Sequence, residues 1–170
     1  MDFMKLAAAR YSVRKFTEQP VEDEKLQTIL EAGRLAPTAR NFQPQKVYVL
    51  RSPEAVAKAE KLTGCMYGAS TALLICCDMD RVWNNPLRPG YSTWEVDPSI
   101  VTTHMMLAAW ELGVGSVWVG HFNDAEVVEA FDLPANIRPV AFLPLGYAAI
   151  GPKEQQHSVF RPAEETIGYL

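Results

Sequence analysis

The sequence has few cysteines, no long apolar run and no excess of positive charge. The three cysteines, Cys65, Cys76 and Cys77, form no Cys-x-x-Cys pair and no cysteine–histidine spacing typical of a metal site, so we interpret them as reduced thiols. No apolar run approaches the roughly 20 residues that cross a bilayer, and the first residues lack the layout of a signal peptide. We therefore expect a cytoplasmic protein without a membrane segment.

The charge balance narrows the classes of ligand. Sixteen Lys and Arg residues stand against 20 Asp and Glu residues, a formal net charge of −4. Binding along a nucleic-acid backbone normally needs a basic face, so the composition argues against it and leaves room for a local phosphate site. The chain has 170 residues and is 48% hydrophobic, enough for one sizeable core and too short for two ordinary domains. We expect one domain over residues 1–170.

Helical and extended patterns alternate along the chain, with no internal repeat. Ser52 is expected to cap a helix that has Pro53 at its first position and ends near Gly64. About four strands with helices against them predict an α+β or three-layer α/β arrangement. The expected helices span residues 2–10, 21–36, 52–64, 97–113 and 123–133, and the expected strands span 46–51, 71–79, 116–120 and 140–147.

The segment from Asp97 to Gly113 is apolar on nearly every helical face, which is typical of a helix buried all round. A chain of this size has few places to bury such a helix, so we expect a second subunit to cover part of it. The preceding residues 80–97 are rich in Pro, Asn and Gly and predict a loop. That loop carries Trp83, Tyr91 and Trp94, which suit either stacking on a planar ligand or packing in the core or an interface.

The stretch "RYSVRKF" places Arg10, Ser12 and Arg14 at alternate positions. In an extended segment these three side chains project from one side, so two guanidinium groups flank a hydroxyl, an arrangement that suits phosphate oxygens. The same residues also fit a solvated turn after a helix, and the stretch alone does not exclude that reading.

Two other stretches carry polar or glycine-rich turns. "LAPTARNFQPQ" follows a helix and offers Asn41 and Gln43 as donors and acceptors, whereas "GVGSVWVGHF" approaches the end of a strand and contains no dinucleotide-binding G-x-G-x-x-G pattern. Each also fits a plain helix stop or turn. His104 lies in an apolar helix and is expected to be a hydrogen-bonded core residue. His121 follows Gly120 and is a candidate for contact with a ligand.

The order of four motifs resembles the nitroreductase family of flavin enzymes, over nearly the whole chain. The motifs are "RYSVRKF", "APTARNFQP", "LAAWELGVGSVWVG", and "LPLGY" followed by "FRPAEETI". The resemblance implies a nitroreductase-like α+β fold in three layers, with a central, mostly antiparallel sheet flanked by helices. It also implies an intertwined homodimer that binds FMN at the subunit interface and uses NADH or NADPH to reduce small acceptors such as nitroaromatics or quinones.

The resemblance also assigns the residues of the site. The N-terminal motif would hold the FMN phosphate and ribityl chain, the turn after the second helix would lie against the flavin ring of the partner subunit, and the third motif would line the other side of the ring. A basic residue near the C-terminus would complete the phosphate site, and Arg161 is the candidate, although Phe160 occupies the expected position. The cofactor-binding candidates are Arg10, Tyr11, Ser12, Arg14, Pro37, Thr38, Ala39, Asn41, Trp118, Val119, Gly120 and Arg161.

Chemistry in such a site belongs to the flavin, so no catalytic side chain is expected, with His121 the one candidate. Gln45 stands where an aromatic residue often follows "QP" in the family, and Ala148 where a proline often follows "GY". These departures concern the substrate side and a strand end more than the flavin. Two alternatives stay open: a flavin-binding protein that stores or senses its ligand without turnover, and a divergent flavin chemistry. The physiological acceptor and the choice between NADH and NADPH also stay open.

Overall fold

A computed structural model describes residues 2–151 and 159–170, and it contains one four-stranded antiparallel sheet with strand order β1-β2-β4-β3. Strand β2 lies at the centre, and all of its residues except the last are buried. The helices are α1 (Phe3–Ala9), α2 (Asp23–Arg34), α3 (Pro53–Thr63), α4 (Val96–Glu111), α5 (Asp124–Ala130) and α6 (Ala163–Thr166), with a 3₁₀ turn η1 (Ala39–Asn41). The strands are β1 (Gln45–Leu50), β2 (Thr71–Asp78), β3 (Gly115–Ser116) and β4 (Ile137–Gly146).

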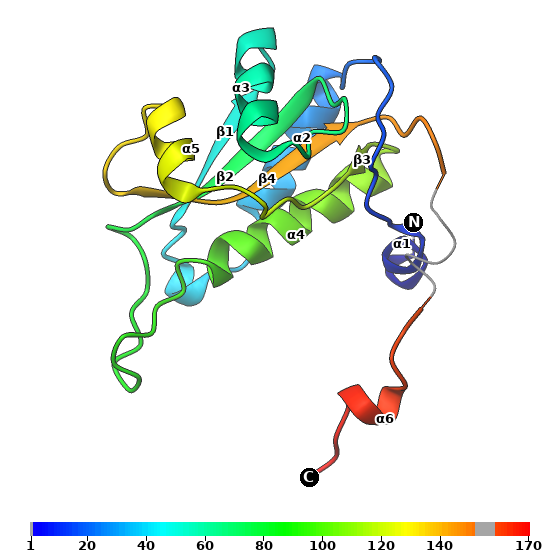
Figure 1. Cartoon of the computed structure of the whole chain (residues 1–170). Helices are drawn as coiled ribbons and strands as arrows, with labels where there is room; N and C mark the ends of the chain where they lie inside the picture. The colour runs from blue at the N-terminus through cyan, green and yellow to red at the C-terminus, as the bar shows by residue number, and fades with distance from the viewer. Residues whose placement is uncertain (1, 152–158) are drawn as a thin grey trace.

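Helices cover both faces of the sheet, and Figure 1 shows α4 on one side and α3 and α5 on the other. Successive side chains of a strand point to opposite faces, so β2 contributes to two cores. Leu74 packs with Phe142 and the residues of α3 and α5, whereas Leu73 and Ile75 pack with α2 and α4. The predicted three-layer α+β fold is confirmed.

Local signals fix the two ends of α3 as predicted, and a side-chain cap also begins α5. The Ser52 hydroxyl accepts a hydrogen bond from the Ala55 amide, Pro53 is the first residue of α3, and Gly64 ends the helix in the left-handed conformation with φ 62°. A left-handed C-terminal residue satisfies helix carbonyls at no steric cost when it is glycine. Asn123 caps α5 by accepting from two backbone amides.

The strand predicted at 116–120 is wrong in its extent. Strand β3 covers only Gly115–Ser116, and beyond it the pairing with β4 reduces to a single bridge between Val119 and Phe142. The intervening Val117 lies next to Pro144, which has no N–H, and the contact is limited to one hydrogen bond of 3.4 Å from the Val117 amide to the Pro144 carbonyl. The proline breaks the ladder while leaving the chain extended.

Helix α4 buries one face within this chain. Val101, Met105 and Ala109 are fully buried against α2 and the sheet, whereas Leu107 on the other side is half-buried. The prediction that His104 lies in the core is wrong, because His104 is exposed on the open side and its Nδ1 lies 3.0 Å from the carbonyl oxygen of Ile100 in the same helix. The buried residues Val101, Met105 and Ala109 recur four positions apart, and His104 lies beside this stripe, at its exposed border.

The C-terminal residues 159–170 extend away from the body of the chain (Figure 1). Five large apolar side chains in this tail are exposed, Tyr169 by 95% and Phe160 by 80%, together with Val159, Ile167 and Leu170. Within residues 2–151 and 159–170, no helix combines the length and hydropathy needed to cross a membrane.

Candidate functional site

The segment from Arg10 to Phe16 runs along the edge of the sheet beside β3. Ser12 pairs with Ser116 in a parallel bridge, and the Val13 amide donates to the Ser116 carbonyl at 3.0 Å. Val13 and Phe16 are buried, and they pack so closely over Gly115 and Gly146 that a Cβ at either glycine would come within 3.0 Å of them. The two glycines therefore bring the segment onto the sheet edge and hold it in an extended course.

Arg10 lies at the end of α1, where its backbone amide donates to Leu6. Its side chain is partly buried, and Nη1 is a buried nitrogen without a hydrogen-bond partner among the described residues. Burial lowers the pKa of this guanidinium from its ordinary value, because desolvation disfavours its charge. Arginine remains protonated in proteins, so a buried N–H without a partner is a costly arrangement that an anionic oxygen would relieve.

Arg14 lies next to a pair of side chains from the loop before β2. Its guanidinium interacts with the Tyr67 side chain, which also interacts with Cys65. The interaction with Cys65 and burial raise the pKa of Tyr67, whereas Arg14 opposes that shift. The Phe16 amide donates to the Tyr67 carbonyl at 3.0 Å, so the loop also fixes the backbone of the basic segment. Sequence reasoning missed Tyr67, because nothing local links it to Arg14.

Residues Trp118, Val119 and Gly120 continue from β3 along the same edge. Val119 is buried and exchanges backbone hydrogen bonds with Phe142, both at 2.9 Å, which anchors the stretch. Trp118 is half-buried, and Gly120 and His121 are exposed. The structure therefore brings the basic segment and this stretch together through β3, as the predicted site requires.

The turn from Pro37 to Asn41 lies elsewhere on the chain. The Ala39 amide donates to the carboxylate of Asp97 at 3.0 Å, at the start of α4, whereas Tyr11 stacks edge-on against Trp110 near the end of α4, with ring centroids 5.1 Å apart. At about 1.5 Å of rise per residue, these two positions on the helix are roughly 20 Å apart. One chain thus keeps the two predicted halves of the site at opposite ends of α4.

The backbone of that turn is strained. Arg40, Asn41 and Gln43 adopt positive φ angles of 52°, 57° and 52°. Residues with side chains rarely adopt this conformation, and such residues cluster at binding sites where the surrounding structure holds them. Pro37, Asn41 and Gln43 are exposed, and Thr38 and Ala39 are half-buried, so the turn presents its polar groups to the surface.

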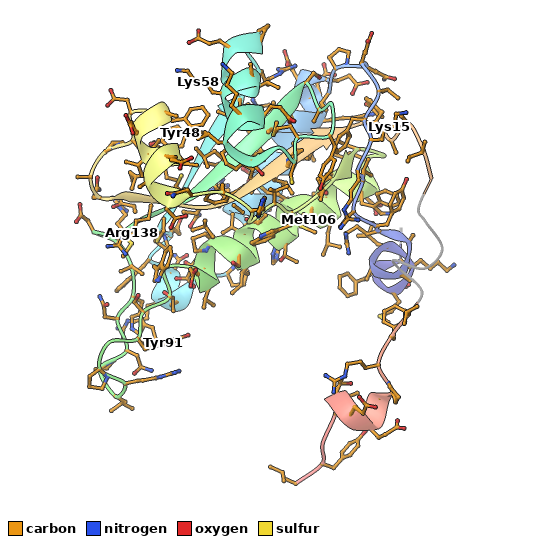
Figure 2. All side chains as sticks on the ribbon, in the orientation of Figure 1. Lys15, Tyr48, Lys58, Tyr91, Met106 and Arg138 are labelled. Carbon is orange, nitrogen blue, oxygen red and sulfur yellow. The ribbon has the colours of Figure 1, made fainter. Side chains whose placement is uncertain are left out.

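The loop between β2 and α4 extends from the body near the turn, and Figure 2 shows Tyr91 near its far end and Arg138 nearer its base. Trp83, Tyr91 and Trp94 are half-buried. Arg88 lies over the Tyr91 ring at 4.5 Å, and Arg138 lies over the Trp94 ring at 5.9 Å. Two of the three aromatic side chains, Tyr91 and Trp94, are thus each paired with an arginine inside the chain.

Arg161 is not brought to the other site residues within this chain. It is exposed in the tail, and its Nε donates to Glu165 at 3.0 Å, one turn along. An exposed pair of this kind contributes little to stability, so the guanidinium is available for another partner.

The protein is thus a three-layer α+β protein with a cationic segment along one edge of its antiparallel sheet. A model of the nitroreductase family matches residues 7–67 and 57–147. The chain belongs to this family.

Three similar proteins support this family membership. A nitroreductase family protein of Clostridium difficile 630 has a solved structure that superimposes with a TM-score of 0.94 at 41% identity, covering 99% of this chain and 98% of that chain. A protein of Archaeoglobus fulgidus, provisionally named NADH dehydrogenase/NAD(P)H nitroreductase, is 34% identical over 160 residues, which are 90% of this chain and 87% of that protein. A Bacillus subtilis protein named FMN reductase [NAD(P)H] is 29% identical over 155 residues, which are 81% of this chain and 62% of that protein.

Proposed function

We propose that this chain is an FMN-dependent oxidoreductase that takes electrons from NADH or NADPH and passes them to a small acceptor such as a nitroaromatic or a quinone, in a ping-pong mechanism. Family membership supports the reaction class, and the Bacillus subtilis relative is named for FMN and NAD(P)H. Residues 1–170 would form one FMN-binding domain. The cytoplasmic location remains a prediction.

One observation carries the choice of cofactor. The Nη1 atom of Arg10 is buried and has no partner among the described residues, although a guanidinium is among the costliest groups to bury unpaired. Ser12 and Arg14 lie on the same extended segment, so the site offers two cations and a hydroxyl at one sheet edge. These groups fit the phosphate of FMN.

The remaining candidates have distinct tasks in this proposal. Tyr11 packs on Trp110 and holds the basic segment against α4. Trp118, Val119 and Gly120 would line one side of the cofactor, and His121, which is exposed, would face the substrate. FMN itself, once bound, supplies the two-electron chemistry, while the protein orients it and leaves one face open.

The other side of the site would come from a second copy of the chain. Pro37, Thr38, Ala39 and Asn41 lie at the opposite end of α4 from the basic segment, so within one chain they do not reach the same ligand. In a homodimer whose interface includes the solvent-facing side of α4, the turn at residues 37–41 of one subunit would lie near the basic segment, residues 10–16, of the other. The exposed apolar tail supports this assembly, because isolated chains seldom leave so much apolar surface uncovered. Arg161 on that tail would reach the phosphate only from such an assembly.

The test is direct. Acid release from the purified protein followed by chromatography should yield FMN at one per subunit, and NADH or NADPH should bleach the bound flavin rapidly. An added quinone or nitroaromatic should then restore the colour. Released FAD, or no flavin uptake, would contradict the cofactor assignment, whereas bound FMN that neither nucleotide reduces would favour storage or sensing.

A further inference from the structure

A buried carboxylate connects the start of α4 to the turn proposed to face the flavin. Asp97 is only 2% exposed. Its Oδ1 accepts from the backbone amide of Ala39 at 3.0 Å, and its Oδ2 accepts from the hydroxyl of Thr93 at 2.7 Å. Thr93 is itself buried at the end of the loop between β2 and α4. One side chain therefore bridges three segments: the loop, the helix and the turn.

The position of Asp97 in α4 makes this role unusual. Asp97 is in the first turn of the helix, where an acidic side chain often stabilises the helix's own free amides. Here both carboxylate oxygens point to other segments instead, and the backbone amide of Asp97 is already bonded to the Thr93 carbonyl at 3.0 Å. The buried carboxylate of Asp97 therefore supports the turn and does not cap the helix that contains it.

The turn needs an external support, because its backbone is strained. Its internal bonds include Asn41 amide to Thr38 carbonyl at 3.0 Å and Gln43 amide to Thr38 hydroxyl at 3.1 Å. These bonds close the turn on itself and do not fix it to the rest of the molecule. The Asp97–Ala39 bond is charge-assisted and partly buried, which makes it among the stronger bonds available to a backbone amide.

We infer that Asp97 is a positioning residue, which fixes the Pro37–Asn41 turn at the depth and angle needed to contact the flavin ring bound mainly by the partner subunit. This inference rests on the proposed function. Because Asp97 acts on the ring side, its loss should weaken riboflavin and FMN by the same factor. Loss of Arg10 should instead weaken FMN alone.

The experiment uses four variants of the full chain. Asp97→Ala removes both acceptors, Asp97→Asn keeps one acceptor for Ala39 and can donate to Thr93, and Thr93→Val removes the second contact. Thr102→Val is the matched control, since Thr102 is also buried in α4 but bonds to the Pro98 carbonyl of its own helix. The measurements are the hydrogen-exchange rate of the Ala39 amide without flavin, the dissociation constants of FMN and riboflavin, and the visible spectrum of the bound flavin.

The Asp97→Ala variant should exchange its Ala39 amide faster, bind both flavins about tenfold or more weakly and shift the flavin spectrum. Thr93→Val and Asp97→Asn should each show a smaller loss, and Thr102→Val should remain close to wild type. If Asp97→Ala does not fold, Thr93→Val carries the test, and wild-type binding and spectrum in that variant overturn the inference.

The outcomes separate the two proposals. Wild-type protein that takes up no flavin overturns the proposed function and this inference with it. Wild-type protein that binds FMN, next to a folded Asp97→Ala variant with the same two affinities and spectrum, overturns this inference alone. A loss of FMN affinity with riboflavin binding unchanged also overturns it, because the effect would then act on the phosphate.

Discussion

Arg10 combines a full charge with partial burial and a nitrogen that lacks a partner among the described residues. A protein tolerates such a group where a ligand completes its hydrogen bonds. Arg14 differs, because Tyr67 already engages its guanidinium. The two arginines therefore contribute unequally to an anion site, with Arg10 offering the unfilled donor and Arg14 a charge held in place by its neighbour.

Replacing Arg10 or Arg14 by Ala should weaken FMN binding. A hydrogen bond to a charged group is worth about 1.5–3 kcal/mol, so the dissociation constant should rise about tenfold or more at each site. Riboflavin lacks the phosphate and should bind each variant as it binds the wild type. Fluorescence titration of both ligands measures the two constants, and unchanged FMN affinity in both variants would remove the phosphate role.

The buried thiols give a pH-dependent contribution to stability. Burial raises the pKa of Cys76 to about 12 and the pKa of Cys77 to about 11, with the carboxylates of Asp97 and Asp78 adding to the shift at Cys77. Both values are above that of an unfolded thiol. Folding therefore favours the protonated thiols, and their contribution is fully present below about pH 9 and is lost as the pH rises toward about 11–12.

The free energy of unfolding should accordingly fall between about pH 9 and pH 11. Urea unfolding at several pH values measures it, and Cys77→Ala should show a shallower fall than the wild type. A thiol reagent at about pH 8 should label the half-buried Cys65 first, because Cys76 and Cys77 are inaccessible and protonated. Rapid labelling of all three cysteines in folded protein would contradict the burial on which this prediction depends.

Among the elements, the short β3 and the basic segment depend on two glycines. A Cβ at Gly115 would lie 2.6 Å from Cγ2 of Val13, and a Cβ at Gly146 would lie 2.9 Å from Cδ1 of Phe16. The branched Val13 side chain has little freedom to move away. Gly115 and Gly146, which have no side chain, therefore allow the close approach to the sheet that positions residues 10–14.

Gly115→Ala should destabilise the fold by about 1–3 kcal/mol and weaken FMN binding by displacing the basic segment. Gly151→Ala is the matched control, because a Cβ there meets no atom of the described residues within 4 Å. Denaturant unfolding and flavin titration measure the two effects. Wild-type stability and affinity in Gly115→Ala would show that Val13 and its segment yield without cost.

The sequence predicted the elements whose signals are local. Ser52, Pro53 and Gly64 bound α3 through their own chemistry, whereas the alternation of Arg10, Ser12 and Arg14 suited an extended segment and equally fitted a turn. Non-local contacts were not predictable. Pro144 shortens β3 from another strand, and Asp97 reaches Ala39 across 58 positions of sequence, which no spacing pattern reports.

Among the described residues, the C-terminal tail carries exposed apolar side chains and helix α4 carries half-buried ones. Figure 2 shows Met106 on α4, and Met106 and Leu107 are half-buried there. Fully burying a side chain of this size is worth about 1.5–3 kcal/mol, so a second copy covering both surfaces would gain considerable free energy. Cofactor binding and dimerisation would then be linked, because each site draws on both chains.

Leu107→Arg should separate the subunits, since burying an unpaired charge in an interface is costly. Sedimentation should show monomers, and flavin absorbance should fall with dimer content. Glu126→Arg provides the control, because Glu126 is exposed on α5 across the sheet from α4 and should leave the dimer intact. A folded Leu107→Arg monomer that still binds FMN with wild-type affinity would refute the shared site.

The central position of β2 in the sheet also affects how the chain folds during its synthesis. Strand β2 pairs with β1 on one side, but its other edge waits for β4, whose residues Ile137–Gly146 leave the ribosome much later. Until then the apolar run from Thr71 to Cys77 has one unpaired edge, a property that favours aggregation. A nascent chain stalled before Ile137 should therefore remain protease-sensitive and should bind a chaperone, whereas one extended past Gly146 should become protected.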